Sequence, residues 1–241
     1  MTLAPAQIIR LRKQIAEDGF AILESVLDPE AVTGLIAALE ISATAAAPNL
    51  RDLTATIPQV AQLCSLSPIC QIADEVLEGR AFVARSLLFD KTPGANWKVA
   101  WHQDLTIAVR EKRELAGYGP WSMKAGVPHV QPPASVLEGM ITLRVHLDYC
   151  NISNGALKVL PGSHRRGRLT PLEIERMRGS ISPVTCTVAA GGILVMRPLL
   201  LHASAPAERP AHRRVIHLEF AAKGLPGGLI WFENRATQGV K

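Results

Sequence analysis

The segment AWHQDLTIAV, residues 100–109, places a histidine and an aspartate two positions apart within an otherwise apolar run. If this segment is an extended strand, successive side chains lie on opposite faces. His102 and Asp104 then share one face with Thr106 and Ala108. The other face carries the residues that we expect to anchor the strand by packing: Trp101, Gln103, Leu105, Ile107 and Val109.

An imidazole and a carboxylate on one strand face can supply two ligands of a metal site. Iron(II) used for oxygen chemistry is commonly held by two histidines and one carboxylate, which leave open positions for a co-substrate and oxygen. A three-residue H-x-D match is a weak signal, because it arises often by chance. The alternative interpretation is that Asp104 only orients His102 or caps a turn.

The metal interpretation requires a third ligand from a later histidine. His202 is distinctive, because it ends the apolar run GGILVMRPLLLH and stands where a buried strand emerges into a loop. His146 lies on the polar face of the alternating segment 141–148, where we expect it to face solvent or to hydrogen-bond Asp148. The remaining candidates lie in turns, irregular stretches or the last strand: His129, His164, His212 and His217.

The strand HRRVIHLEF, residues 212–220, follows His202 and carries two adjacent arginines. A dicarboxylate co-substrate such as 2-oxoglutarate would chelate iron through its 2-oxo acid end, and its distal carboxylate would need a fixed cation. The planar fork of arginine suits that role, since it can donate two parallel hydrogen bonds. Arg213 and Arg214 point to opposite faces of the strand, so either one is the candidate and the other is a surface arginine.

Four segments occur in the order seen in the phytanoyl-CoA dioxygenase family of iron(II)/2-oxoglutarate oxygenases. They are WHQD at 101–104, NGALKVLPGSH at 154–164, LHAS at 201–204 and RRVIHLEF at 213–220. The chain resembles this family over about residues 15–222. The ordered set is far more specific than any single segment.

The resemblance implies a set of ligands for each cofactor. Iron would be bound by His102, Asp104 and His202, and 2-oxoglutarate by an arginine about eleven residues after the distal histidine, which is Arg213. Ser204 matches a family position that also contacts the 2-oxoglutarate carboxylate. The chain would then use oxygen to hydroxylate or otherwise oxidise a small molecule, with release of succinate and CO2. Because Asp104 is retained, the resemblance argues against a halogenase, in which that position is typically vacated for chloride.

Helical patterns dominate the first 80 residues. Ile8, Leu11 and Ile15 recur at helical spacing, Asp28-Pro29-Glu30 is a helix start, and Ser67-Pro68 opens another helix. Residues 43–49 are predicted to form a loop.

From residue 81 the pattern has a period of two, as in strands, for example in ITLRVHLD at 141–148. Within this part, Thr170, Pro171 and Glu173 predict a capped helix over 170–177. The order of elements predicts a mainly β fold, and the resemblance implies a double-stranded β-helix (jelly roll, cupin-like) core packed against an N-terminal helical layer. We expect one domain over 1–241, with a helical layer at 1–80, the core at 81–222 and a C-terminal tail at 223–241.

Two further segments have more than one possible role. Residues 110–139 are rich in Gly and Pro and read as a long irregular loop, which is either a lid over the substrate or surface decoration. The tetrapeptide PGSH at 161–164 is predicted to form a turn, with Ser163 and His164 satisfying that turn rather than acting in catalysis.

Composition narrows the class of protein. The net charge of +5 comes from 26 Lys and Arg against 21 Asp and Glu, and no aromatic-laced basic stripe indicates nucleic-acid binding. Ordinary surface charge explains this balance, although a basic protein also favours anionic substrates. The four cysteines show no zinc-like spacing, and no signal peptide or membrane span is visible, so we expect a cytoplasmic protein with a small-molecule substrate.

Two other functions fit the same residues. A zinc-dependent hydrolase could use the three ligands, but the Arg213 strand would then have no role. A jelly-roll module that binds a small molecule without turning it over should have lost a ligand or the arginine, and this chain retains all four. The sequence leaves the oligomeric state open.

Overall fold

The first part of the chain is mainly helical. The computed structural model describes residues 2–42 and 50–234. Its N-terminal part holds α1 (Pro5–Glu17), β1 (Phe20–Leu23), α2 (Pro29–Ser42), α3 (Leu53–Thr56), α4 (Pro58–Ser65) and α5 (Ser67–Leu77). The predicted start of α2 is confirmed, since Ala31 N donates to Asp28 Oδ1 at 2.8 Å. The predicted loop at 43–49 lies outside the described residues.

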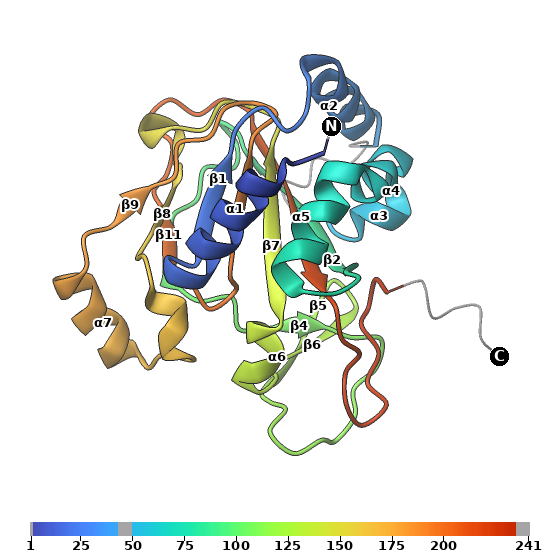
Figure 1. The fold of residues 1–241 in the computed structure, drawn as a ribbon, viewed down its shortest axis with the longest axis vertical. Helices are drawn as coiled ribbons and strands as arrows, with labels where there is room; N and C mark the ends of the chain where they lie inside the picture. The colour runs from blue at the N-terminus through green and yellow to red at the C-terminus, as the bar shows by residue number, and fades with distance from the viewer. Residues whose placement is uncertain (1, 43–49, 235–241) are drawn as a thin grey trace.

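The largest sheet has the strand order β1-β10-β7-β12-β2, with every neighbouring pair antiparallel. Its further strands are β2 (Phe82–Lys91), β7 (Met140–His146), β10 (Ile193–Met196) and β12 (Arg213–Ala221). Alternate apolar residues of these strands, such as Leu143 and Leu218, join Leu11 and Ile72 of the helices in one buried cluster. Helices α1 and α5 accordingly lie across one face of this sheet (Figure 1).

A second sheet has the order β3-β11-β8-β9 and consists of short strands. They are β3 (Val99–His102), β8 (Leu157–Val159), β9 (Val184–Thr185) and β11 (His202–Ser204). Residues of β2, β7 and β12 line one cavity together with residues of β3, β8 and β11, so the two sheets enclose it. The main sheet is therefore apolar toward the helices and polar toward this interior.

The prediction of a continuous strand over 100–109 is wrong. Strand β3 ends at His102, and β4 (Ile107–Ala108) belongs to a third sheet of order β4-β6-β5. The chain crosses between the sheets at 103–106, where Asp104 N donates to Pro198 O at 2.9 Å. Because the alternation is broken there, Ala108 does not share the His102 face but is buried beside Ile107.

Residues 110–139 are more regular than predicted. They form β5 (Trp121–Lys124), β6 (Val127–Val130) and α6 (Ala134–Glu138). The hairpin of β5 and β6 pairs with β4 through Ile107 and Val130. Pairing with a strand that lies outside the segment supplies the hydrogen bonds that its Gly- and Pro-rich composition does not predict.

The expectation for His146 is also wrong. It is buried at 2% exposure, and Asp148 binds the side chain of Arg214 instead, at 3.0 Å from both Nε and Nη2. The physical reason is that the polar face of β7 points into the interior between the sheets rather than to solvent. The short 3₁₀ helices η1 (Ile152–Asn154) and η2 (Ser163–Arg166) flank β8.

The predicted helix at 170–177 is confirmed as α7 (Pro171–Ser180). Thr170 and Glu173 form the capping box, in which Glu173 N donates to Thr170 Oγ1 at 3.3 Å and Thr170 N donates to Glu173 Oε2 at 2.7 Å. After β12, the chain returns to the core, where Trp231 and Glu233 are buried. None of the helices in residues 2–42 and 50–234 combines the length and apolar character needed to cross a bilayer.

Candidate metal centre

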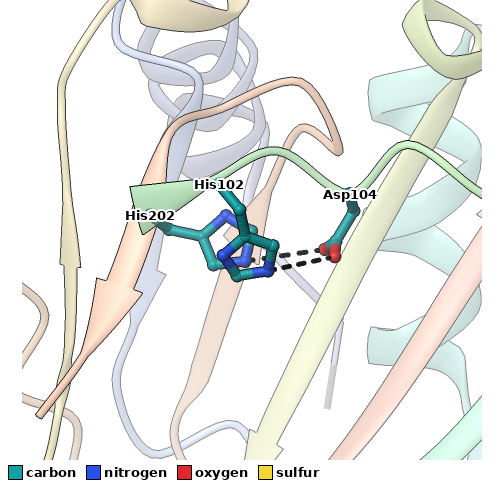
Figure 2. Close-up of side chains that lie close together, drawn as sticks. All are labelled: His102, Asp104 and His202. Atoms are coloured by element: carbon teal, nitrogen blue, oxygen red, sulfur yellow. Dashed lines mark ion pairs between the residues drawn. The ribbon is translucent and has the colours of Figure 1, made fainter. Parts of the chain in front are cut away.

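His102, Asp104 and His202 meet at one point between the two sheets. His102 and His202 are directly paired across β3 and β11, and Asp104 follows the end of β3 by two residues. Figure 2 shows the three side chains converging, with the carboxylate facing both rings. One oxygen of Asp104 lies 3.7 Å from His102 Nε2 and the other lies 3.7 Å from His202 Nε2. The ligand atoms all lie within 4.8 Å of one another.

Backbone carbonyls fix the tautomer of both histidines. His102 Nδ1 lies 2.9 Å from Ala100 O, and His202 Nδ1 lies 2.9 Å from Leu200 O. A carbonyl can only accept, so each Nδ1 must carry the hydrogen and each Nε2 must present a lone pair when the ring is neutral. This arrangement is the usual support of metal-binding imidazoles.

The charge states also suit a cation. Burial lowers the pKa of His202 to about 4, so its ring is neutral at pH 7. Burial alone would raise the pKa of Asp104, but the nearby His202, His217 and His102 rings outweigh it and lower that pKa to about 2. The site thus offers one carboxylate and a free imidazole lone pair at neutral pH, and a divalent cation would compensate the carboxylate charge.

Two neighbouring side chains hold the ligand segments in place. Gln103 is buried between the two ligands, and its Nε2 donates to Gly167 O and Leu199 O, both at 2.7 Å. Its Oε1 accepts from Leu169 N at 2.8 Å. Ser163 Oγ accepts from Leu201 N at 2.8 Å, next to His202. The PGSH turn therefore supports a ligand strand, a role that the turn interpretation alone does not give it.

A cavity of about 160 Å³ extends from the three ligands to a cationic end. There Lys91 and Arg213, which are paired across β2 and β12, are 1% and 4% exposed. Lys91 Nζ donates to Ser204 Oγ at 2.9 Å and also to Ala205 O. Arg213 Nη1 donates to Gly155 O at 2.7 Å, while the buried Nε of Arg213 has no partner among the described residues.

The structure separates the two candidate arginines. Arg213 lines the cavity beside Ser204. Arg214 points to the opposite face of β12, where it binds Asp148 and contacts Glu40 Oε1 at 2.9 Å. Only Arg213 can therefore reach a ligand held between the sheets.

A chain of buried polar groups forms the wall of the cavity along β12. Arg144 Nη1 donates to His217 Nδ1 at 2.9 Å, which leaves the hydrogen on Nε2 to be donated to Glu219 Oε1 at 3.1 Å. Glu219 also accepts a hydrogen bond from Arg85. These hydrogen bonds link the four side chains without any ligand, while the buried Nε atoms of Arg144 and Arg85 have no partner among the described residues.

The other candidate histidines do not join the centre. His217 lies in the cavity wall, His146 is buried further along β7, and His212 Nδ1 lies 2.7 Å from Asp90 Oδ2. His129 is buried on β6 with Nδ1 3.0 Å from Val127 O, and His164 is the second residue of η2.

Sequence reasoning missed Lys91 and Arg144 as cavity residues. The alternation of side chains along β2 and β7 was the available signal for both residues. Lys91 is in phase with Phe89 of the same strand, and Arg144 is in phase with His146, but the face that points inward could not be chosen without the register of the sheets.

The donor set fits iron(II). Imidazole suits several transition metals, and two histidines with one carboxylate and open positions are typical of non-haem iron(II) oxygenases. The side chains of His102 and Asp104 are 40% and 24% exposed, so the ligand atoms remain open to incoming groups. Together, the fold and the ligands define a double-stranded β-helix protein with a two-histidine, one-carboxylate centre.

The family model of phytanoyl-CoA dioxygenase matches residues 15–215. The chain therefore belongs to the phytanoyl-CoA dioxygenase family, as its ordered motifs predict. No curated protein matches the chain significantly.

Solved structures confirm the fold. AviO1 from Streptomyces viridochromogenes Tue57 has a TM-score of 0.67 and 22% identity, over 93% of this chain and 99% of that chain. The epimerase SnoN in complex with Fe3+, alpha-ketoglutarate (2-oxoglutarate) and nogalamycin RO has a TM-score of 0.70 and 17% identity, over 93% and 92%. EctD from S. alaskensis with 2-oxoglutarate and 5-hydroxyectoine has a TM-score of 0.69 and 18% identity, over 91% and 76%.

Proposed function

We propose that this protein is an iron(II)- and 2-oxoglutarate-dependent oxygenase that oxidises a small organic molecule. One observation carries the proposal: the cavity has a two-histidine, one-carboxylate centre at one end and a buried Arg213 with an unpartnered Nε at the other. A metal ion and a short dicarboxylate would occupy this space together. The zinc hydrolase alternative gives no role to the cationic end.

Each residue of the site has a defined task in this proposal. His102, Asp104 and His202 hold the iron, and their hydrogen bonds to Ala100 O and Leu200 O keep the Nε2 lone pairs aimed at it. Arg213 binds the distal carboxylate of 2-oxoglutarate through its guanidinium fork.

The cationic end supplies two further contacts. Ser204 Oγ lies beside the same carboxylate position and is already fixed by Gly155 O at 2.8 Å. Lys91 adds a second positive charge and keeps Ser204 in place. Iron with 2-oxoglutarate and oxygen supplies the oxidation of the substrate, with succinate and CO2 as the co-products.

The outcome of the oxidation is not fixed by this site. SnoN is an epimerase, and SnoK, a further structure of this fold with a TM-score of 0.68 and 16% identity, is a carbocyclase. EctD was solved with 5-hydroxyectoine. Hydroxylation is the simplest outcome, and we propose it as the default reaction of this chain.

Anaerobic addition of iron(II) and 2-oxoglutarate tests the proposal. We expect a visible metal-to-ligand charge-transfer band in the wild type, its loss in His102→Ala and His202→Ala, and succinate when air is admitted. His212→Ala is the matched control, because the side chain of this histidine is 61% exposed and its one ion-pair partner in the described part of the chain is Asp90. Absence of both the band and succinate in the wild type would refute the proposed function.

A further inference from the structure

A second pair of cationic side chains lies on the other side of the metal centre from Lys91 and Arg213. Arg51 forms an isolated antiparallel bridge with Leu87 of β2, fixed by hydrogen bonds from Asp52 N to Ser86 O at 3.0 Å and from Leu88 N to Leu50 O at 2.9 Å. Such a non-hydrogen-bonded pair holds its two side chains close together on one face.

The register shows which face this is. Leu87 pairs with His217, and His217 pairs with Arg144, both of which line the cavity. Arg51 is therefore the outermost member of a row that runs across the inner face of the main sheet. It lies next to the row that contains Arg85 and Glu219.

Lys124 reaches the same region from the third sheet. Its Nζ lies 3.4 Å from Thr106 Oγ1, two residues after the metal ligand Asp104. Lys124 stands at the end of β5, opposite Val127 in the hairpin. The side chain thus extends from the 110–139 segment back to the chain crossing that carries the aspartate.

The positive charge of Arg51 and the carboxylate of Asp104 both affect the pKa of Lys124. Burial lowers the pKa of Lys124, the positive charges of Arg85 and Arg51 lower it further, and the carboxylates of Asp104 and Glu219 oppose this shift. Burial also lowers the pKa of Arg51, followed by the effect of Arg85, whereas Glu219 opposes it. Arg85 already binds Glu219, and Asp104 would be held by the metal, so neither carboxylate is left to pair with Arg51 or Lys124.

Neither cation has an anionic partner within residues 2–42 and 50–234. Among the described residues, the one side-chain hydrogen bond of Lys124 is to the Thr106 hydroxyl, and the Arg51 guanidinium has no hydrogen bond or ion pair. Both residues are half-buried, so part of their hydration is already lost. Half-buried cations without counter-charges, beside a reactive centre, favour an anionic ligand.

We propose that Arg51 and Lys124 bind an anionic group of the substrate, a carboxylate or a phosphate, and hold its reactive carbon toward the metal. The inference rests on the proposed function for its catalytic meaning, and it narrows the substrate class to small organic acids or phosphate esters. It also gives the 110–139 segment a defined role, since Lys124 is the part of that segment that would contact the substrate.

Calorimetric titration of the metal-free protein tests the proposal with three probes of equal chain length: hexanoate, hexyl phosphate and the neutral hexanamide. We expect at least one of the anions to bind about tenfold or more tightly than hexanamide. Tighter binding of hexanoate would identify a carboxylate site, and tighter binding of hexyl phosphate would identify a phosphate site.

Matched variants locate the binding. The preference for the anion should disappear in Arg51→Gln/Lys124→Gln. It should persist in Arg10→Gln/Lys13→Gln, which removes the same charges from the exposed side of α1. Circular dichroism and thermal melting would show that each variant is folded.

Equal binding of the three probes by the wild type would overturn the proposal. A preference that is undiminished in Arg51→Gln/Lys124→Gln would do the same. Because no iron or 2-oxoglutarate is present, this experiment can fail while the charge-transfer band appears, and it can succeed while that band is absent. The two proposals are therefore tested separately.

Discussion

The two sides of the metal centre hold their cations in different ways. Lys91 and Arg213 are almost completely buried, and backbone oxygens of Ala205 and Gly155 fix them before any ligand arrives. Arg51 and Lys124 are half-buried, and a hydroxyl is their only fixed partner within the described residues. Burial of a charge is costly unless hydrogen bonds compensate it, so the buried end must be built by the chain itself.

This difference indicates that the two sides of the metal centre bind different ligands. The buried end is preorganised for one short, constant ligand, as a co-substrate requires. The half-exposed side becomes fully paired only when a substrate binds, so its composition sets specificity rather than stability.

Removal of a metal ligand should have the largest effect. In His202→Ala, iron(II) affinity should fall by more than the roughly 10–100-fold that follows loss of an outer hydrogen-bond partner of a ligand. Equilibrium dialysis with iron(II) measures this directly. Retention of near-native iron affinity in His202→Ala would show that the metal, if bound, lies elsewhere.

The pH dependence of 2-oxoglutarate binding should report on the buried end. Burial and the neighbouring Arg213 lower the pKa of Lys91 from 10.5 to about 8. Lys91 is therefore charged below pH 8 and loses its charge above it, so the dissociation constant should be flat below pH 8 and rise above it by up to about tenfold per pH unit.

Lys91→Met provides the control for this titration. Binding in this variant should be weaker at pH 7 and should lack the rise above pH 8. The same slope in the variant and in the wild type would show that another group titrates.

Loss of Gln103 should reduce stability and metal affinity together. Gln103→Ala leaves Gly167 O, Leu199 O and Leu169 N without their partner, and a buried polar group left unsatisfied costs about 1–3 kcal/mol. We expect a lower free energy of unfolding by denaturant and weaker iron binding. Unchanged iron affinity in the folded variant would limit Gln103 to a structural role.

The smallest effect should come from Ser163. Ser163→Ala removes one acceptor, that of Leu201 N, and should lower the free energy of unfolding by about 1–3 kcal/mol. Thermal melting measures this change, and Ser180→Ala is a matched control at the exposed end of α7. A destabilisation no larger than that of Ser180→Ala would contradict the proposed support of the His202 strand.

Regular elements could be predicted where local rules decide them. The capping box of α7 and the start of α2 depend on residues within one turn, and both are as predicted. The crossing at 103–106 depends on long-range hydrogen bonds of Gln103 and Asp104, which no local pattern encodes. The sheet of β4, β5 and β6 could not be predicted for the same reason.

The residues of the candidate site could likewise be predicted only in part from the sequence. Spacing and family resemblance named His102, Asp104 and His202, which the structure brings together. The alternation of β12 showed that Arg213 and Arg214 lie on opposite faces, but the inward face was set by the register with β2 and β7. Arg51 and Lys124 come from segments without a motif, and only the tertiary structure places them near the centre.

Titration of 2-oxoglutarate into the anaerobic iron(II) protein, followed by the charge-transfer band, shows whether the buried cationic end binds the co-substrate. Arg213→Gln should weaken binding by about tenfold or more, because charge-assisted hydrogen bonds contribute about 1.5–3 kcal/mol. Arg214→Gln, which carries the same change one residue away on the outer face, should bind 2-oxoglutarate as the wild type does. Equal weakening in both variants, or a larger loss in Arg214→Gln, would contradict the assignment of the buried end to the co-substrate.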